Sequence, residues 1–430
     1  MSAPTLAPAR YGAPFLSSLE ARSTRYGVFF ATYLYQGLIA GFSLTALANH
    51  LAARGVSAAE IGTHFALAGL PWTFQPILWG PLVDRAGEFR MGRRRPFAVI
   101  AILGCHATLA LTLLLDAERV GLLGLAFLAH SLFASLLDTA CDRMIMDHVP
   151  AGELGRVSAC TRAGFVVGTS LSAALFAWTL AAHGLAATLV WMLLLGTLAT
   201  LPMLAVREAP ADTLIGFGRR GPAPRRLPVR RFLRRLGLAL RRPAALRLLA
   251  LCFGLDGALG LFELPFSVEL IQRHGWDPAA LSRLQAALAL ASGTAGAFAV
   301  GLWSDRAGPV RPMRALLLAS SVTFVLAGGL IAAGFVGSAG PLLALTGALP
   351  GLLIVALMPA LLQASRGRAG AATQFEIYMA AMNFGSVAGT ALAGWFAPLM
   401  PLALVAALVA AAFLAAFRMV GRGDLFAPRG

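Results

Sequence analysis

Ionisable side chains within long apolar segments are the residues of this sequence best suited to chemistry. Asp138 and Asp142 lie four residues apart in one such segment, and Asp256 and Glu263 lie seven apart in another. Both spacings place two carboxylates on one face of a helix, where repulsion between like charges favours protonation of one of them. Arg162, in the following apolar segment, is the available counter-charge for the aspartate pair. Charge inside an apolar segment is costly and normally kept for function, so these five residues are expected to bind a solute or carry protons.

Uncharged polar side chains extend this predicted site, although structural pairing between helices remains an alternative for its charged members. Gln374 and Tyr378 share a helical face, whereas Glu376 points elsewhere, so the three are not expected to face one cavity. Asp147 and Arg156 flank a loop and are expected to form a structural ion pair. The predicted cavity residues are Asp138, Asp142, Arg162, Asp256, Glu263, Gln36, Gln374 and Tyr378.

Membrane-spanning helices are the elements that must position these residues. The chain has 430 residues, of which 58% are hydrophobic and 13% charged, whereas soluble domains are about 45 to 50% apolar. Apolar segments of about 20 residues, enough to cross ~30 Å of hydrocarbon, recur about twelve times. We therefore predict an all-α integral membrane protein with transmembrane helices at 26–48, 59–83, 96–115, 120–142, 157–181, 185–206, 246–271, 280–303, 313–336, 341–363, 371–396 and 400–419.

The arginines predict how these helices cross the membrane. All 35 basic residues are Arg, and 31 of them fall in the tails and loops of one side. Such a bias is typical of cytoplasmic loops, so both termini are predicted to be cytoplasmic in a bacterial-type inner membrane. The net charge of +16 is thus explained by topology rather than by nucleic-acid binding. Residues 1–25 lack a compact apolar core, so no cleaved signal peptide is expected.

A duplicated octet divides the chain into two similar halves. Gly80–Gly87 returns as Gly301–Gly308, 221 residues later, each time directly after an apolar run. The predicted domains are an N-terminal tail (1–25), an N-terminal half (26–206), a basic linker (207–245), a C-terminal half (246–420) and a C-terminal tail (421–430). The linker between Arg230 and Arg242 could lie as an amphipathic helix on anionic inner-leaflet lipids, which would gather near residues 219–247, or it could be a solvated connector.

Pairs of glycines spaced by four residues predict close contacts between helices. They are Gly37/Gly41, Gly164/Gly168 and Gly385/Gly389. Without a Cβ, such positions let helix backbones approach one another. The pattern suits both moving and static interfaces.

Two six-helix halves, a basic linker and the repeated hairpin resemble the major facilitator superfamily over essentially the whole chain. The resemblance implies that the hairpins hold one state of an alternating-access cycle closed. In it, Asp84 and Asp305 accept hydrogen bonds from a helix N-terminus or an arginine, with Arg85 and Arg93 as partners. The first copy has the additional arginines and looks the stronger. The implied gate motif comprises Gly80, Asp84, Arg85, Gly87, Arg93, Arg94, Gly301, Asp305 and Arg306.

Several shorter strings look like the AmpG-type muropeptide permeases. They are Tyr35-Gln36-Gly37, Gly69-Leu-Pro-Trp72 and Ala372-Thr-Gln-Phe375. The wider group includes acetyl-CoA transporters and siderophore importers of the pyochelin and rhizobactin type. The resemblance implies proton-coupled import of a medium-sized polar organic solute, either a muropeptide or a siderophore.

Other functions of the same fold stay open at this point. They are export, uniport and sensing without transport. An enzyme is not expected, because HExxH is absent and a chain without Lys has neither a P-loop nor a Schiff-base lysine. No metal-ligand cluster is apparent, no cofactor is expected beyond the proton gradient as energy source, and the protein is expected to be a monomer.

Overall fold

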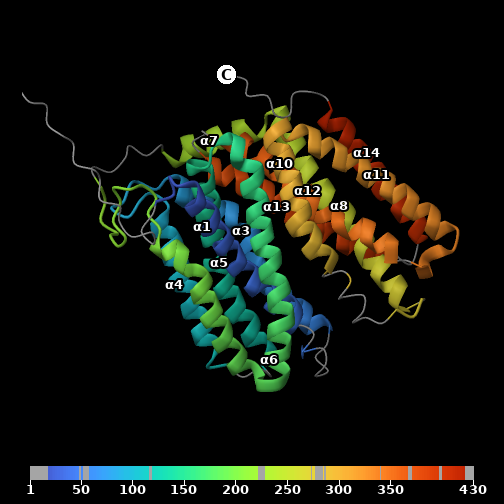
Figure 1. Ribbon diagram of the computed structural model, residues 1–430, viewed down its shortest axis with the longest axis horizontal. Helices are drawn as coiled ribbons and strands as arrows, with labels where there is room; N and C mark the ends of the chain where they lie inside the picture. Colours follow the sequence, from blue (N-terminus) through green and yellow to red (C-terminus); the bar gives the residue numbers. More distant parts are fainter. Residues whose placement is uncertain are drawn as a thin grey trace, which may run out of the picture.

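The computed structural model describes residues 18–47, 50–51, 58–115, 119–220, 228–272, 274–276, 284, 287–338, 340–366, 370–396 and 400–421. The described chain is helical, as predicted, and its helices lie side by side in a bundle (Figure 1). Within these residues, nine segments are long and apolar enough to cross a membrane. Most of both predicted tails lies outside the described residues.

The N-terminal half contains the first six predicted spans. Gly184, with φ 79°, breaks the 52-residue α6 into two spans, because only glycine readily adopts this backbone conformation. The helices are α1 (Arg22–Gly41) with a π-helical continuation (Phe42–Ala46), α3 (Ala58–Asp84), α4 (Arg95–Thr112), α5 (Val120–His148) and α6 (Leu154–Ala205).

The predicted C-terminal half contains helices at the places of the other six predicted spans, as far as the structure describes them. The eighth predicted span, 280–303, lies partly outside the described residues and is seen as a π-helical turn (Ser292–Gly296) leading into α10. The helices are α8 (Pro243–Gln272), α10 (Ala297–Ala307), α11 (Val310–Ala332), α12 (Gly340–Ser365), α13 (Ala371–Phe396) and α14 (Leu402–Val420).

The spaced glycines join equivalent helices in the two halves, as predicted. Gly164 and Gly168 of α6 pack on the backbone of α1, whose Gly37 in turn meets Phe165. Gly385 and Gly389 of α13 pack in the same way on the backbone of α8 at Phe253 and Gly257. Each of these contacts is too close for a Cβ, so α1 with α6 and α8 with α13 form the tightest helix pairs.

The linker between the halves contains the predicted amphipathic helix. This helix, α7, spans Val229–Leu240 and exposes most of its arginines. Its Phe232 is only 3% exposed and faces Gly370 at the start of α13. The earlier part of the linker is tied to the loop between α3 and α4, where the Arg220 N–H donates to Glu88 O and the Arg90 N–H to Gly218 O. We call the end of the bundle that carries these segments the arginine-rich end.

The two halves approach each other at the arginine-rich end and diverge toward the other end (Figure 1). Contacts across the halves join α3 to α13 and α6 to α10 and α12. The structure is therefore closed at the end that carries both copies of the repeated octet.

Candidate functional site

The first copy of the octet caps a helix of the opposite half. Asp84, at the end of α3, accepts hydrogen bonds from the Ala372 N–H (3.0 Å), the Thr373 N–H (2.9 Å) and the Thr373 hydroxyl (2.9 Å). These N–H groups belong to the first turn of α13, where backbone donors lack helical partners and the helix dipole is positive. Arg143 of α5 lies 3.6 Å from the same carboxylate. Asp84 thereby ties α3 and α5 to the C-terminal half.

The second copy makes the reciprocal contact. Asp305, in α10, accepts hydrogen bonds from the N–H groups of Gly155 (2.8 Å) and Arg156 (3.2 Å). The Arg156 guanidinium adds a charged hydrogen bond of 2.5 Å. Each octet thus uses its aspartate to cap a helix of the other half, and the helix N-terminus expected from the family resemblance is present in both copies.

The glycine that begins each octet permits this contact. A Cβ on Gly80 would lie 2.6 Å from Thr373 Cα, and a Cβ on Gly301 would lie 2.5 Å from Gly155 O. Any other residue would push the helices apart before the aspartate could reach its donors. The two copies are therefore equivalent in geometry, although the extra arginines of the first suggested a stronger one.

The arginines of the first copy have different partners from those expected. Arg93 donates to Ala86 O at 3.3 Å, and the arginine that pairs with Asp84 is Arg143 instead. Arg94 is fully buried and donates to Val83 O and, at 3.1 Å, to Asp147. Burial lowers the pKa of Arg94 to about 10, so its guanidinium remains charged at neutral pH.

The predicted ion pair between Asp147 and Arg156 is wrong. Asp147 pairs with Arg94 and Arg143, both at 3.1 Å, whereas Arg156 pairs with Asp305. Asp147 ends α5 facing the loop between α3 and α4, and Arg156 lies in the first turn of α6 facing the other half. Proximity in sequence therefore misassigned both partners.

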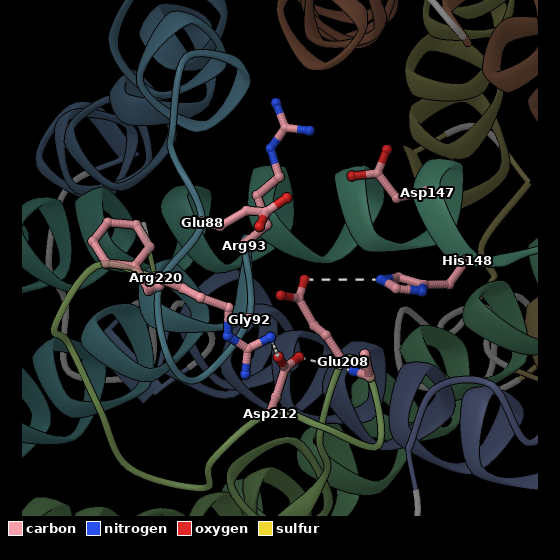
Figure 2. A pocket seen from close by; sticks show the side chains of 10 residues that line it. Glu88, Gly92, Arg93, Asp147, His148, Glu208, Asp212 and Arg220 are labelled. Atoms are coloured by element: carbon pink, nitrogen blue, oxygen red, sulfur yellow. Dashed lines mark hydrogen bonds and ion pairs between the residues drawn. The ribbon is translucent and has the colours of Figure 1, made fainter. Parts of the chain in front are cut away.

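A pocket of about 310 Å³ lies beside Asp147 at the arginine-rich end (Figure 2). His148 and Glu208 approach each other across it at 3.9 Å. Arg220 pairs with Asp212 at 2.9 Å on the linker side. The charged groups that line this pocket thus pair chiefly with one another, and these pairs hold the linker against the bundle.

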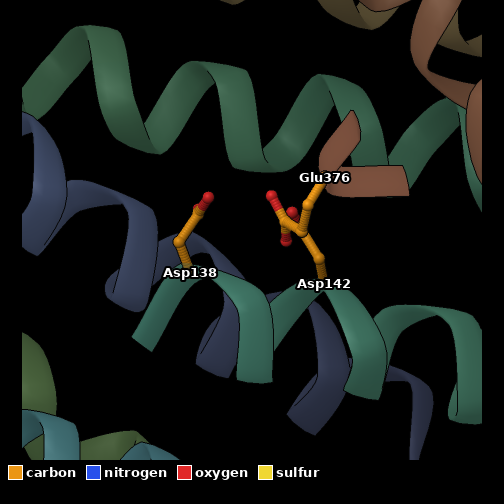
Figure 3. A group of neighbouring side chains, drawn as sticks. All are labelled: Asp138, Asp142 and Glu376. Atoms are coloured by element: carbon orange, nitrogen blue, oxygen red, sulfur yellow. The ribbon is translucent and has the colours of Figure 1, made fainter. Parts of the chain in front are cut away.

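Three carboxylates from both halves meet between α5 and α13 (Figure 3). Oxygens of Asp138, Asp142 and Glu376 all lie within 4.8 Å of one another. The Tyr33 hydroxyl donates to Asp142 at 2.5 Å, and the Gln75 amide donates to Asp138 at 3.0 Å. Nothing in the sequence indicated this group, because Glu376 is far from the two aspartates along the chain and belongs to the other half.

Glu376 is the residue that sequence reasoning left out of the site. Gln374 and Tyr378 hydrogen-bond to each other at 2.7 Å and are both buried, so Glu376 does point elsewhere, as expected. The side chain of Glu376 points toward Asp138 and Asp142. Its acidity within an apolar span was the signal that could have included it.

A second set of charged residues, Arg162, Asp256 and Glu263, lies in helices of both halves. Arg162 of α6 lies within electrostatic range of Asp256 of α8, which in turn is near Glu263. Glu263 is exposed, and Arg162 and Asp256 are partly exposed. Among the described residues, Arg162 forms no ion pair within 4 Å with Asp138, Asp142 or Asp256, and Asp256 is the carboxylate with which it interacts electrostatically. Gln36, also expected in the cavity, approaches Asp138.

The family comparison assigns residues 26–390 to the Major Facilitator Superfamily. The chain belongs to this superfamily. It is therefore a multi-pass membrane transporter of the secondary type, which moves a small-molecule solute through the bilayer.

Solved structures with the same fold agree with this assignment. The human organic anion transporter MFSD10 (TETRAN) superimposes with a TM-score of 0.65 and 16% identity over 95% of this chain and 100% of its own. A bacterial homologue of the iron transporter ferroportin, in an outward-facing state, gives 0.63 and 14% over 94% and 98%. At these identities the likeness shows the fold alone. No curated protein sequence matches the transporter.

Proposed function

We propose that this transporter imports a medium-sized polar organic solute, of the muropeptide or siderophore class, together with protons. The solute would enter from the end opposite the arginines and leave at the arginine-rich end. Alternation between the two openings would require the octet contacts to form and break once per cycle.

The distribution of arginine supports this orientation of the protein in the membrane. Cytoplasmic loops of membrane proteins carry the excess of positive residues, which places the arginine-rich end in the cytoplasm of a bacterial-type inner membrane. The conformation in hand, closed at that end, then corresponds to an outward-facing state. The exposed arginines of α7 would rest on anionic inner-leaflet lipids.

The observation that supports proton coupling is the presence of two partly exposed, opposite charges within membrane-spanning helices of the two halves, Arg162 and Asp256, in electrostatic range of each other but not in an ion pair within 4 Å. While Asp256 is ionised, it attracts Arg162 across the interface and neutralises it. Proton uptake by Asp256 removes that attraction, and Arg162 then becomes free to bind an anionic group of the solute, such as a carboxylate. Muropeptides and many siderophores carry carboxylates, so one proton and one solute would be loaded together.

Two further residues complete the proposed solute site: Gln36 offers an amide from α1, and Glu263 offers an exposed second carboxylate on α8. Gln374 and Tyr378, also predicted to line the cavity, bond to each other on another face of α13, and Gln374 lines a pocket beside α7. Asp138 and Asp142 lie on the same interface, closer to the arginine-rich end. Polar groups from both halves would thus surround a solute held between them.

Uptake into proteoliposomes tests this function. A gradient acidic on the outer side should accelerate uptake of a labelled muropeptide or siderophore by wild-type protein. Asp256→Asn should abolish the acceleration, because an amide cannot exchange a proton. Glu269 lies near the end of the same helix, and its carboxylate pairs with His274. The control variant Glu269→Gln should therefore leave the acceleration by the gradient intact.

The outcomes are decisive for the coupling mechanism. Uptake that ignores the gradient in wild-type protein would make the transporter a uniporter. If Asp256→Asn is still fully accelerated by the gradient, Asp256 does not carry the coupling proton. A thermal-shift screen of anhydro-muropeptides, siderophores and acyl-CoA compounds identifies the solute beforehand, since a ligand of the folded state raises the unfolding temperature.

A further inference from the structure

Among the described residues, no arginine or histidine forms an ion pair within 4 Å with the three carboxylates between α5 and α13. Of the nearby arginines, Arg143 pairs with Asp84 and Asp147, and Arg162 lies near Asp256. Three ionised groups this close, in the interior of a bundle, repel one another and are poorly solvated. Either protons or a cation must therefore offset the negative charge of the group in the closed state.

The carboxylate of Glu376 gives a second, independent indication of a binding site. This residue is 1% exposed, and neither carboxylate oxygen accepts a hydrogen bond of normal geometry among the described residues. Gln75 and Thr139 lie nearby, but the Gln75 amide donates to Asp138 and Thr139 instead. Buried polar atoms are almost always hydrogen-bonded, so an orphaned carboxylate is a rare arrangement. Its oxygens point toward Asp142 from across the interface (Figure 3), which places the unmet acceptors inside the cluster rather than toward solvent.

The atoms that line the cluster indicate which kind of ion it could bind. Every candidate ligand atom is oxygen: three carboxylates, with the hydroxyl of Tyr33 on Asp142 and that of Thr139 beside Gln75. All-oxygen sites suit hard cations such as Ca²⁺, Mg²⁺ and Mn²⁺, whereas softer metals prefer nitrogen or sulfur. Carboxylate oxygens within 4.8 Å of one another match the span of opposite ligands around Ca²⁺, whose bonds are about 2.3 to 2.6 Å.

We propose that Asp138, Asp142 and Glu376 bind one hard divalent cation between the two halves. A divalent ion neutralises two of the three negative charges, which a monovalent ion would not do. The remaining charge is shared with the hydroxyl of Tyr33. This cation site is separate from Asp256, where the coupling proton is placed.

The cation would reinforce closure at the arginine-rich end. Glu376 lies one helical turn beyond Thr373, the residue whose N–H and hydroxyl hold Asp84. Asp142 precedes Arg143, the ion-pair partner of Asp84. An ion bound between Asp142 and Glu376 therefore pulls together the same helices that the first octet joins, and its departure leaves three repelling carboxylates that drive these helices apart.

Binding of Mn²⁺, followed by electron paramagnetic resonance, tests the site. The full-length transporter is placed in nanodiscs of neutral phosphatidylcholine, so that lipid headgroups do not compete for the metal. Wild-type protein should bind one Mn²⁺ saturably and release it to excess Ca²⁺. Glu376→Gln and Asp142→Asn should each weaken binding at least roughly tenfold. Glu269→Gln, which changes a carboxylate of α8 outside the cluster, should bind Mn²⁺ as wild type does.

A conservative variant guards against loss of folding. Glu376→Asp keeps a carboxylate on a shorter arm and should bind Mn²⁺ more tightly than Glu376→Gln. Binding should also weaken as the pH falls from about 8 to about 6, because the ligands must be deprotonated. Equal, weak binding by the Asp and Gln variants would show that the carboxylate is not a ligand and would overturn the site.

Two further results would refute the cation. One is an absence of saturable Mn²⁺ and Ca²⁺ binding by wild-type protein, which would leave protons as the only charge in the cluster. The other is unchanged binding in Glu376→Gln. Neither bears on proton coupling, which depends on uptake by Asp256→Asn, so the two conclusions stand or fall separately.

Discussion

Replacing Asp305 with alanine should part the two halves at the arginine-rich end. Its carboxylate accepts hydrogen bonds from the N–H groups of Gly155 (2.8 Å) and Arg156 (3.2 Å), and each bond to a charged acceptor contributes about 1.5 kcal/mol. The Arg156 side chain is 26% exposed, so its ion pair adds only about 0.5 kcal/mol. The closed state should therefore lose about 3.5 kcal/mol, which shifts the equilibrium toward the open end by more than roughly 100-fold.

Labelling of a buried cysteine measures this opening. Ser304 is 4% exposed and faces Gly155 across the interface, and Ser304→Cys changes its size little. In a background without the native cysteines, a maleimide should react with this thiol only while the halves are apart. Asp305→Ala should raise the labelling rate by roughly the shift in the equilibrium, up to the rate of a fully exposed thiol. Asp305→Asn keeps one acceptor oxygen and should give an intermediate rate.

Asp84→Ala provides the companion experiment on the other octet. Asp84 holds two N–H groups and a hydroxyl of α13, so its loss should open the same end to a similar extent. Because Asp84 lies on another helix, this variant leaves the surroundings of the probe unchanged. The exposed Glu88→Gln should have no effect. A change of less than about twofold in both folded alanine variants would refute the closing role of the octets, since a loss of this size must be visible.

Two further substitutions test packing and buried charge. Gly168→Val should lower the stability of the detergent-solubilised protein by about 2 kcal/mol, because its Cβ would collide with the backbone of α1 at Leu34. Gly254→Ala serves as the control, since a Cβ at this position meets nothing within 4 Å. Equal melting temperatures of the two variants would contradict the close contact at Gly168. Arg94→Gln should cost about 3 kcal/mol by thermal unfolding, since it leaves Asp147 without its buried partner. The exposed Arg93→Gln should cost much less, and equal losses would show that burial of Arg94 contributes nothing.

The helices of this transporter are predictable from local sequence. A helix in lipid satisfies its own backbone hydrogen bonds, so the length of each apolar segment fixes its place almost independently of its neighbours. The duplicated octet and the glycines spaced by four could also be recognised from the sequence, because each pattern lies within a few consecutive residues. The break at Gly184 and the amphipathic α7 follow from the same local rules.

Partners across helices could not be assigned in this way. The predicted pair of Asp147 with Arg156 was wrong. Arg162 forms no ion pair within 4 Å with the aspartates of α5 among the described residues, and Glu376, which was left out of the predicted cavity, lies against Asp138 and Asp142. Each outcome depends on how a helix is rotated and on which half it meets, and neither is encoded by spacing along one segment. The sequence thus identified which residues are unusual, and the packing of one half against the other selected their partners, because charges interact through space rather than along the chain.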